Sequence, residues 1–143
     1  MNRKQGKSTI QNKHGTIIDH ADVRRMLISM RADIFASRSI ELENAKAIDM
    51  ANATEEPEWI NKAAFLTPIT KVFGTEIGIN ISNLGVQIHG GMGFIEETGA
   101  AQFSRDVRVT AIYEGTNGIQ AMDLVGRKMM DNGETCLLYT SDA

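Results

Sequence analysis

The chain has 143 residues, which is enough for one domain with a buried core. Its 42% hydrophobic and 23% charged residues are typical of a globular protein and unlike a disordered or fibrous one. A net charge of -3 gives no electrostatic basis for a nucleic-acid partner. Two prolines and 6% aromatic residues favour helices over a β-sandwich or barrel, so we predict an all-α fold.

No stretch of the sequence approaches the roughly 18 apolar residues that a membrane span needs, and no secretory signal opens the chain. We therefore expect no membrane span and a cytoplasmic location.

Residues 1–18 carry Arg3 and several lysines among polar residues, without apolar periodicity. They are expected to form a loop or a frayed helix end, in which Arg3 belongs either to a solvated basic arm or to a phosphate-binding contact.

Two long helices are predicted next. From Asp19 to about Ala51, apolar residues recur at steps of three and four, which is typical of an amphipathic helix. The sequence TEEP at 54–57 then combines a hydroxyl cap, acids and a proline, and it indicates a new helix start. The apolar stripe that follows extends to about Gly90, and Pro68 should kink this second helix.

Glycines at 90, 91 and 93 are expected to end the second helix. A short helix is predicted over Glu96–Ser104, and a last one runs from a Thr116 cap to about Met129. The predicted architecture is therefore an all-α helical bundle.

The final eight residues, Cys136–Ala143, back-translate to a transposase adapter used in sequencing libraries. We therefore exclude residues 136–143 from the fold and expect a fragment whose Met1 need not be a native start.

Several patterns that bear on chemistry have plain structural alternatives. The GGMGF segment at 90–94 lacks the third glycine and the preceding strand of a dinucleotide-binding fingerprint. Its glycines either only end a helix or leave bare backbone that a ligand can approach. The three histidines have no metal-ligand spacing, so no metal site is predicted. Arg105, Asp106 and Arg108 are expected to form local ion pairs.

Glu114 is the candidate catalytic residue, because it is the only acid between Asp106 and Asp123 and stands among apolar neighbours. A carboxylate in such a setting has a raised pKa, which suits a base that works near neutral pH. Helix capping or pairing with a cation is the alternative role for this side chain.

Three segments together resemble the acyl-CoA dehydrogenase family, in the family's order and spacing: QIHGGMGF at 87–94, RDVR at 105–108 and IYEGT at 112–116. The resemblance covers residues 3–130 and implies that residues 19–135 are the C-terminal helical domain of a chain several times longer. Further segments, among them FLTPITKVFGTEIG at 65–78, are similar to the subgroup that includes 3-methylmercaptopropionyl-CoA dehydrogenase.

The resemblance implies roles for individual residues. Glu114 would remove the α-proton of an acyl-CoA thioester while the β-hydrogen leaves as hydride to FAD, and its backbone N–H would bind the thioester carbonyl. Thr116 would contact FAD near the base, whereas Gln87 and Gly91 would contact the FAD of a neighbouring subunit. Arg3 stands where the family has an arginine on the FAD pyrophosphate, although the segment here is one residue shorter. Many members carry, at the position of Gly118, a glutamine whose side chain can reach the cofactor. Glycine leaves only a backbone contact with the cofactor at this position.

The resemblance also implies partners: an acyl-CoA substrate, electron-transfer flavoprotein as electron acceptor, and assembly as a homodimer or homotetramer. An acyl-CoA oxidase, which uses oxygen, and a catalytically idle helical oligomerisation bundle are the alternatives. The fragment alone is expected to be inactive, because the family completes its site with two further domains.

Overall fold

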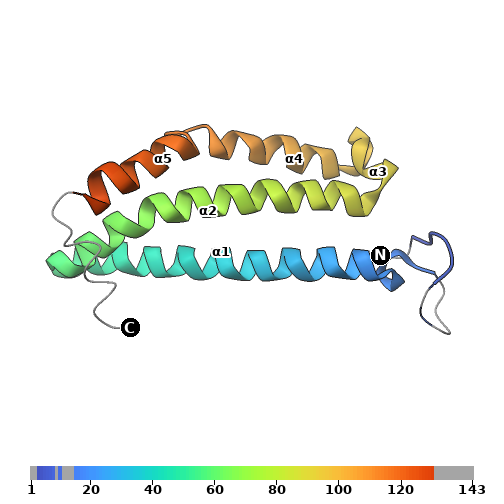
Figure 1. Ribbon diagram of the computed structural model, residues 1–143, viewed down its shortest axis with the longest axis horizontal. Coiled ribbons are helices and arrows are strands. Elements are labelled where there is room, and N and C mark those ends of the chain that lie inside the picture. The colour runs from blue at the N-terminus through green and yellow to red at the C-terminus, as the bar shows by residue number, and fades with distance from the viewer. Residues whose placement is uncertain (1–2, 9, 11–14, 131–143) are drawn as a thin grey trace.

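The computed structural model describes residues 3–8, 10 and 15–130, and within them it contains helices and no strand (Figure 1). The all-α prediction is therefore confirmed. The five α-helices are α1 (Ala21–Thr54), α2 (Pro57–His89), α3 (Gly91–Phe94), α4 (Ala100–Arg108) and α5 (Asn117–Asp123). Short 3-10 helices cover Ile17–Asp19, Glu96–Thr98 and Val109–Ala111, and a π-helical turn follows at Leu124–Met129.

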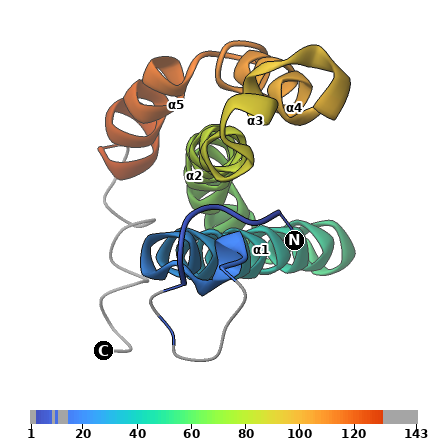
Figure 2. The same cartoon turned by 90° about the vertical axis from the view of Figure 1, so that its right-hand side faces the viewer.

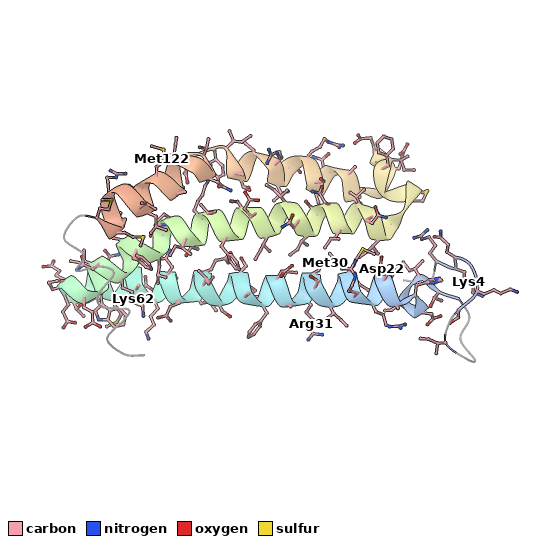
Figure 3. The ribbon with its side chains drawn as sticks, viewed as in Figure 1. Lys4, Asp22, Met30, Arg31, Lys62 and Met122 are labelled. Carbon is pink, nitrogen blue, oxygen red and sulfur yellow. The ribbon has the colours of Figure 1, made fainter. Side chains whose placement is uncertain are left out.

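The helix α2 lies at the centre of the fold. It runs beside α1 along the long axis, while α4 and α5 lie on the side of α2 that faces away from α1 (Figures 1 and 2). The α1–α2 interface is closed at one end by Ile17, Met26 and Ile88, all buried. Met30 points from α1 towards α2, whereas Arg31, the next residue, points away from it (Figure 3). This alternation is what the predicted amphipathic pattern requires.

The ends of the two long helices differ from the prediction only in detail. The helix α1 continues beyond Ala51 to Thr54 and stops where Glu55 takes a left-handed conformation with φ of 55°. Pro57 is the first residue of α2, as the sequence indicated. Pro68 lies inside α2, which stays continuous but whose first turns are inclined to the rest of the helix (Figure 1). Proline removes one backbone donor and crowds the preceding turn, which explains the bend.

The predicted short helix over Glu96–Ser104 is wrong in its bounds. Gly99, with φ of 74°, separates a 3-10 turn at Glu96–Thr98 from α4, which extends to Arg108. The local ion pairs expected for Arg105 also differ from those in the structure. Arg105 pairs with Glu96, in the preceding 3-10 turn, at 2.6 Å.

The prediction for the last helix is correct at its start, where the Thr116 hydroxyl accepts the Ile119 N–H at 3.3 Å. At its other end, the regular helix changes into the π-helical turn after Asp123. None of the described helices is long and apolar enough to cross a membrane. The suspected adapter segment at 136–143 lies outside the described residues.

The Glu43–Lys62 ion pair joins α1 to α2 and should make stability depend on pH. The hydrogen bond from Lys62, and then its positive charge, lower the pKa of Glu43 below the ordinary value of 4.5. The stabilisation of the fold by this ion pair is therefore fully present above the pKa that Glu43 has in the unfolded chain. It is lost as the pH falls through the lower pKa that Glu43 has in the folded chain. Because Glu43 is 44% exposed, the effect should stay within about 1 kcal/mol.

Urea unfolding of the chain, followed by far-ultraviolet circular dichroism at about pH 7 and about pH 3, checks this expectation. Glu43→Gln should lose less stability between the two pH values than the parent. Equal losses in parent and variant would mean that this ion pair does not contribute to the acid sensitivity.

Candidate functional site

Glu114 lies in a turn with an unusual backbone, between the 3-10 helix Val109–Ala111 and α5. Glu114 has φ of 53° and Gly115 has φ of 85°, so two successive residues are left-handed. For a residue other than glycine this conformation costs about 1–2 kcal/mol, and it persists only where surrounding groups enforce it. The turn should therefore be held by contacts from outside.

Two side chains from different helices hold the carbonyl groups of these two residues. Gln120 of α5 donates its Nε2–H to the Glu114 carbonyl at 3.0 Å. Lys71 of α2 donates from Nζ to the Gly115 carbonyl at 2.8 Å. The two peptide groups that follow the Glu114 Cα atom are thus each tied to a helix.

Asn117, the first residue of α5, connects the same region to α2 through its side-chain amide. Its Oδ1 accepts from Lys71 Nζ at 2.9 Å and from the Thr75 hydroxyl at 3.2 Å. Its Nδ2 donates to Glu76 Oε1 at 2.7 Å. The amide oxygen faces donors and the amide nitrogen faces an acceptor, so the hydrogen-bonding capacity of this group is well used.

The Glu114 carboxylate itself is exposed. Its neighbours Ile112 and Tyr113 are 55% and 52% exposed, so the apolar enclosure expected from the sequence is not built by the described residues. Within the described chain, the carboxylate neither caps a helix, since Thr116 does so, nor pairs with a cation. Its backbone N–H likewise has no acceptor among these residues. Both groups are therefore available to a ligand.

A second group of predicted residues lies at the far end of α2. Arg3 donates from Nη2 to the Ile88 carbonyl at 2.9 Å and from Nη1 to Gln5 Oε1 at 2.8 Å. Arg3 and Gln87 line one open hollow of about 310 Å³, together with Gly90. Gly90, with φ of 63°, ends α2, and Gly91 is exposed beside it.

The two groups do not meet in one chain. Lys71, below the Glu114 turn, and Gln87 are 16 residues apart in the same helix, which corresponds to about 24 Å. The structure therefore places Glu114 with Thr116, and Arg3 with Gln87 and Gly91, in two separate regions. In the described part of the chain, no three His, Cys, Asp or Glu side chains gather as a metal site would require.

Lys71, Thr75 and Asn117 are parts of this arrangement that the sequence analysis did not select. One pattern points to the first two: Thr67, Lys71 and Thr75 follow at steps of four and form a polar stripe along a helix that is otherwise mostly apolar. Asn117, the partner of Lys71 and Thr75, lies more than 40 positions further along the chain, and no such pattern points to it.

Comparison with known proteins defines the class to which this fold and turn belong. Residues 7–130 match the family described as acyl-CoA dehydrogenase, C-terminal domain. The chain therefore belongs to the acyl-CoA dehydrogenase family, and the resemblance based on the three motifs is confirmed.

The chain is also similar to individual members of this family. The chain is 51% identical over 120 residues to 3-methylmercaptopropionyl-CoA dehydrogenase of Ruegeria pomeroyi, a match that covers 82% of this chain and 20% of the relative. It is 35% identical over 141 residues to a butyryl-CoA dehydrogenase of Syntrophomonas wolfei, covering 90% and 23%. It is also 40% identical over 79 residues to 3-(aryl)acrylate reductase of Clostridium sporogenes, covering 55% and 21%. The chain thus spans about a fifth of the length of these relatives.

Proposed function

We propose that this chain is the C-terminal catalytic part of an FAD-dependent acyl-CoA dehydrogenase, with Glu114 as the base that removes the α-proton of the thioester. The observation that carries the proposal is the Glu114 turn. Two carbonyl groups of the turn are held by Lys71 and Gln120, while the carboxylate and the N–H of Glu114 have no partner among the described residues. A backbone in this rare conformation, supported from two helices, is typical of a functional site.

The chemistry of this site needs a base and a donor for the carbonyl. The α-proton of a thioester is weakly acidic, and its removal places negative charge on the carbonyl oxygen. A carboxylate at Glu114 would accept the proton, and the N–H of the same residue would stabilise the developing charge, as an oxyanion hole does. The exclusion of water that strengthens both effects must come from groups outside the described residues, because the Glu114 side chain is exposed.

The residues present suit FAD as the cofactor, which when bound would accept the β-hydrogen as hydride. At the far end of α2, the Arg3 guanidinium uses two of its five N–H donors within the described chain. The remaining donors, beside the bare backbone of Gly90 and Gly91, offer the charged hydrogen bonds that a pyrophosphate prefers. Gln87 would add an amide from the same hollow. Thr116 would contact FAD beside the base.

The separation of the two regions supports a shared site in a homodimer or homotetramer. One chain would place Glu114 and Thr116 at its own cofactor, and Gln87 and Gly91 at the cofactor of a neighbour. The outer face of α1 also exposes large apolar side chains at seven-residue steps, with exposed fractions of 69%, 75% and 68% for Ile28, Phe35 and Leu42. Such a stripe is typical of a surface that another domain or subunit covers.

A chimera tests the proposed function. Residues 7–130 of this chain would replace the corresponding part of the Ruegeria pomeroyi relative, with which the chain shares 51% identity. We expect the chimera to retain FAD and to convert 3-methylmercaptopropionyl-CoA to the 2-enoyl-CoA, with electron-transfer flavoprotein as acceptor.

The acceptor is decided by measuring the same reaction in air without electron-transfer flavoprotein. Oxygen consumption at the full rate would identify an oxidase instead. A folded chimera that contains FAD but forms no enoyl product from this thioester or from butyryl-CoA would contradict the proposed function.

A further inference from the structure

We propose that Lys71 is a positioning residue for Glu114: from the middle of α2, its ammonium group sets the place and conformation of the turn that carries the base. The two bonds from Lys71 reach residues 115 and 117, on either side of Thr116, and 44 and 46 positions along the chain. Since Glu114 is the base in the function proposed above, this role depends on that function.

The choice of partners distinguishes Lys71 from an ordinary surface lysine. Its side chain is half-buried, and within the described chain it donates to a carbonyl and an amide oxygen and pairs with no acid. Lys62, nine positions earlier in the same helix, instead pairs with the Glu43 carboxylate. A charged donor gives a stronger hydrogen bond than a neutral one, so the Gly115 carbonyl is held more firmly than a backbone contact would hold it.

The position of these bonds lets Lys71 constrain the backbone directly after Glu114, and so the place from which its side chain extends. The Gly115 carbonyl belongs to the peptide group between residues 115 and 116, and the Glu114 carbonyl to the group before it. Lys71 holds the first of these peptide groups and Gln120 holds the second, so the φ and ψ angles of Gly115, which lie between the two groups, are constrained. Without Lys71, Gly115 is free to leave its φ of 85°, because glycine has access to most of the conformational map.

The network around Asn117 extends this control to the cap of α5. Asn117 Oδ1 accepts from both Lys71 and Thr75, and its neighbour Thr116 caps the helix through the Ile119 N–H. A single ammonium group therefore holds the turn on one side of Thr116 and the first residue of α5 on the other. We refer to these bonds of Lys71 to Gly115 and Asn117 as the lysine tether.

The test compares Lys71→Met, Lys71→Arg and Lys62→Met in the chimera. Methionine keeps most of the lysine stem and removes the donor, whereas arginine restores a cation with several donors. Lys62→Met removes a lysine from the same helix at its Glu43 ion pair and serves as the matched control. Rates are expressed per bound flavin, so that a loss of folded enzyme does not count as a loss of rate.

In Lys71→Met, kcat per flavin should fall by about tenfold to a hundredfold, because small misplacements of a catalytic group have effects of this size. KM should change by less than about threefold, since the substrate-binding groups remain. The kinetic isotope effect with an α-deuterated thioester should increase, as proton removal becomes slower than the other steps. Lys71→Arg should recover most of the rate, and Lys62→Met should match the parent.

Hydrogen exchange gives a readout that does not need turnover. The amides of Ile119 and Gln120 bond to Thr116 and report on the end of the tether, at 3.3 and 3.0 Å. They should exchange at least about tenfold faster in Lys71→Met, because the variant loses both charged hydrogen bonds of the lysine tether. Asn117→Ala removes one of the two bonds of the lysine tether and keeps the bond to Gly115, so it should change exchange and rate in the same direction but less, and the double variant should be little worse than Lys71→Met alone.

An unchanged kcat per flavin and an unchanged isotope effect in Lys71→Met would overturn the proposal. A rate that falls equally in Lys62→Met would do so as well, since any lysine of α2 would then have the same effect. If the methionine variant does not fold, Asn117→Ala decides between the same two outcomes. Failure of the proposed function is separate: Glu114→Gln would then leave turnover unchanged, whatever Lys71→Met does to exchange.

Discussion

Replacing Glu114 with glutamine in the chimera should lower kcat by between about 100-fold and 10,000-fold, the usual contribution of a positioned general base. The amide has nearly the same size and shape as the carboxylate but cannot accept the α-proton. The backbone should keep its conformation, because the bonds that hold the turn involve the carbonyl groups of Glu114 and Gly115 and not the Glu114 side chain. Enoyl-CoA formation per bound flavin measures the effect.

Glu97→Gln is the matched control for this substitution. Glu97 is also an exposed glutamate, but it lies in the 3-10 turn Glu96–Thr98, away from the Glu114 turn. Its replacement should leave kcat within about twofold of the parent, as expected for an exposed residue outside the site. FAD content should be equal in the parent and both variants. Full turnover in Glu114→Gln would show that another group removes the proton.

Replacing Gly93 with alanine should destabilise the fold by about 3 kcal/mol, at the upper end of the cost of overpacking. Gly93 is buried where α3 folds back on the last turn of α2. A Cβ atom there would overlap the carbonyl oxygen of Val86 and would lie 2.8 Å from the Cβ atom of His89. Both obstacles are close to the backbone of α2, so relief requires α3 to move and not only a side chain to rotate.

Gly85→Ala, in α2, is the control with the same chemical change. Apart from the adjacent residues and the backbone of α2 itself, no atom of the described residues lies within 4 Å of a Cβ placed at Gly85. Alanine is favoured over glycine inside a helix by about 0.5–1 kcal/mol, so this variant should be slightly more stable than the parent. Urea unfolding followed by circular dichroism compares the two. A Gly93→Ala variant as stable as the parent would mean that α3 does not pack this closely on α2.

The two long helices were predictable because their information is local. Apolar residues at steps of three and four, with Pro57 at the start of the second helix, define α1 and α2 to within a few residues. The split at Gly99 was missed because a helical pattern does not reveal whether a glycine within it takes a positive φ. The end of α1 was missed for a similar reason, since Glu55 adopts a conformation that its residue type does not favour.

The candidate site was predictable only in part. Glu114 could be selected from the sequence as an isolated acid, and its family confirms the class of protein but does not test the role of any residue. The contacts that hold Glu114 could not be predicted, because Lys71 meets Gly115 only after the chain has turned through α3 and α4. The predicted apolar surroundings of Glu114 also failed to form, since Ile112 and Tyr113 lie on the surface of this chain.

The continuity of α2 restricts how this domain can change in length. The helix contacts Gly115 through Lys71 and Asn117 through Lys71, Thr75 and Glu76, and it carries Gln87 near its end, with no break between them. Inserting or deleting one residue in this interval would rotate one set of side chains relative to the other by about 100° and shift it by about 1.5 Å. Substitutions between residues 77 and 86 should therefore be tolerated far better than insertions or deletions, because only a change in length alters the orientation of Gln87 relative to Lys71.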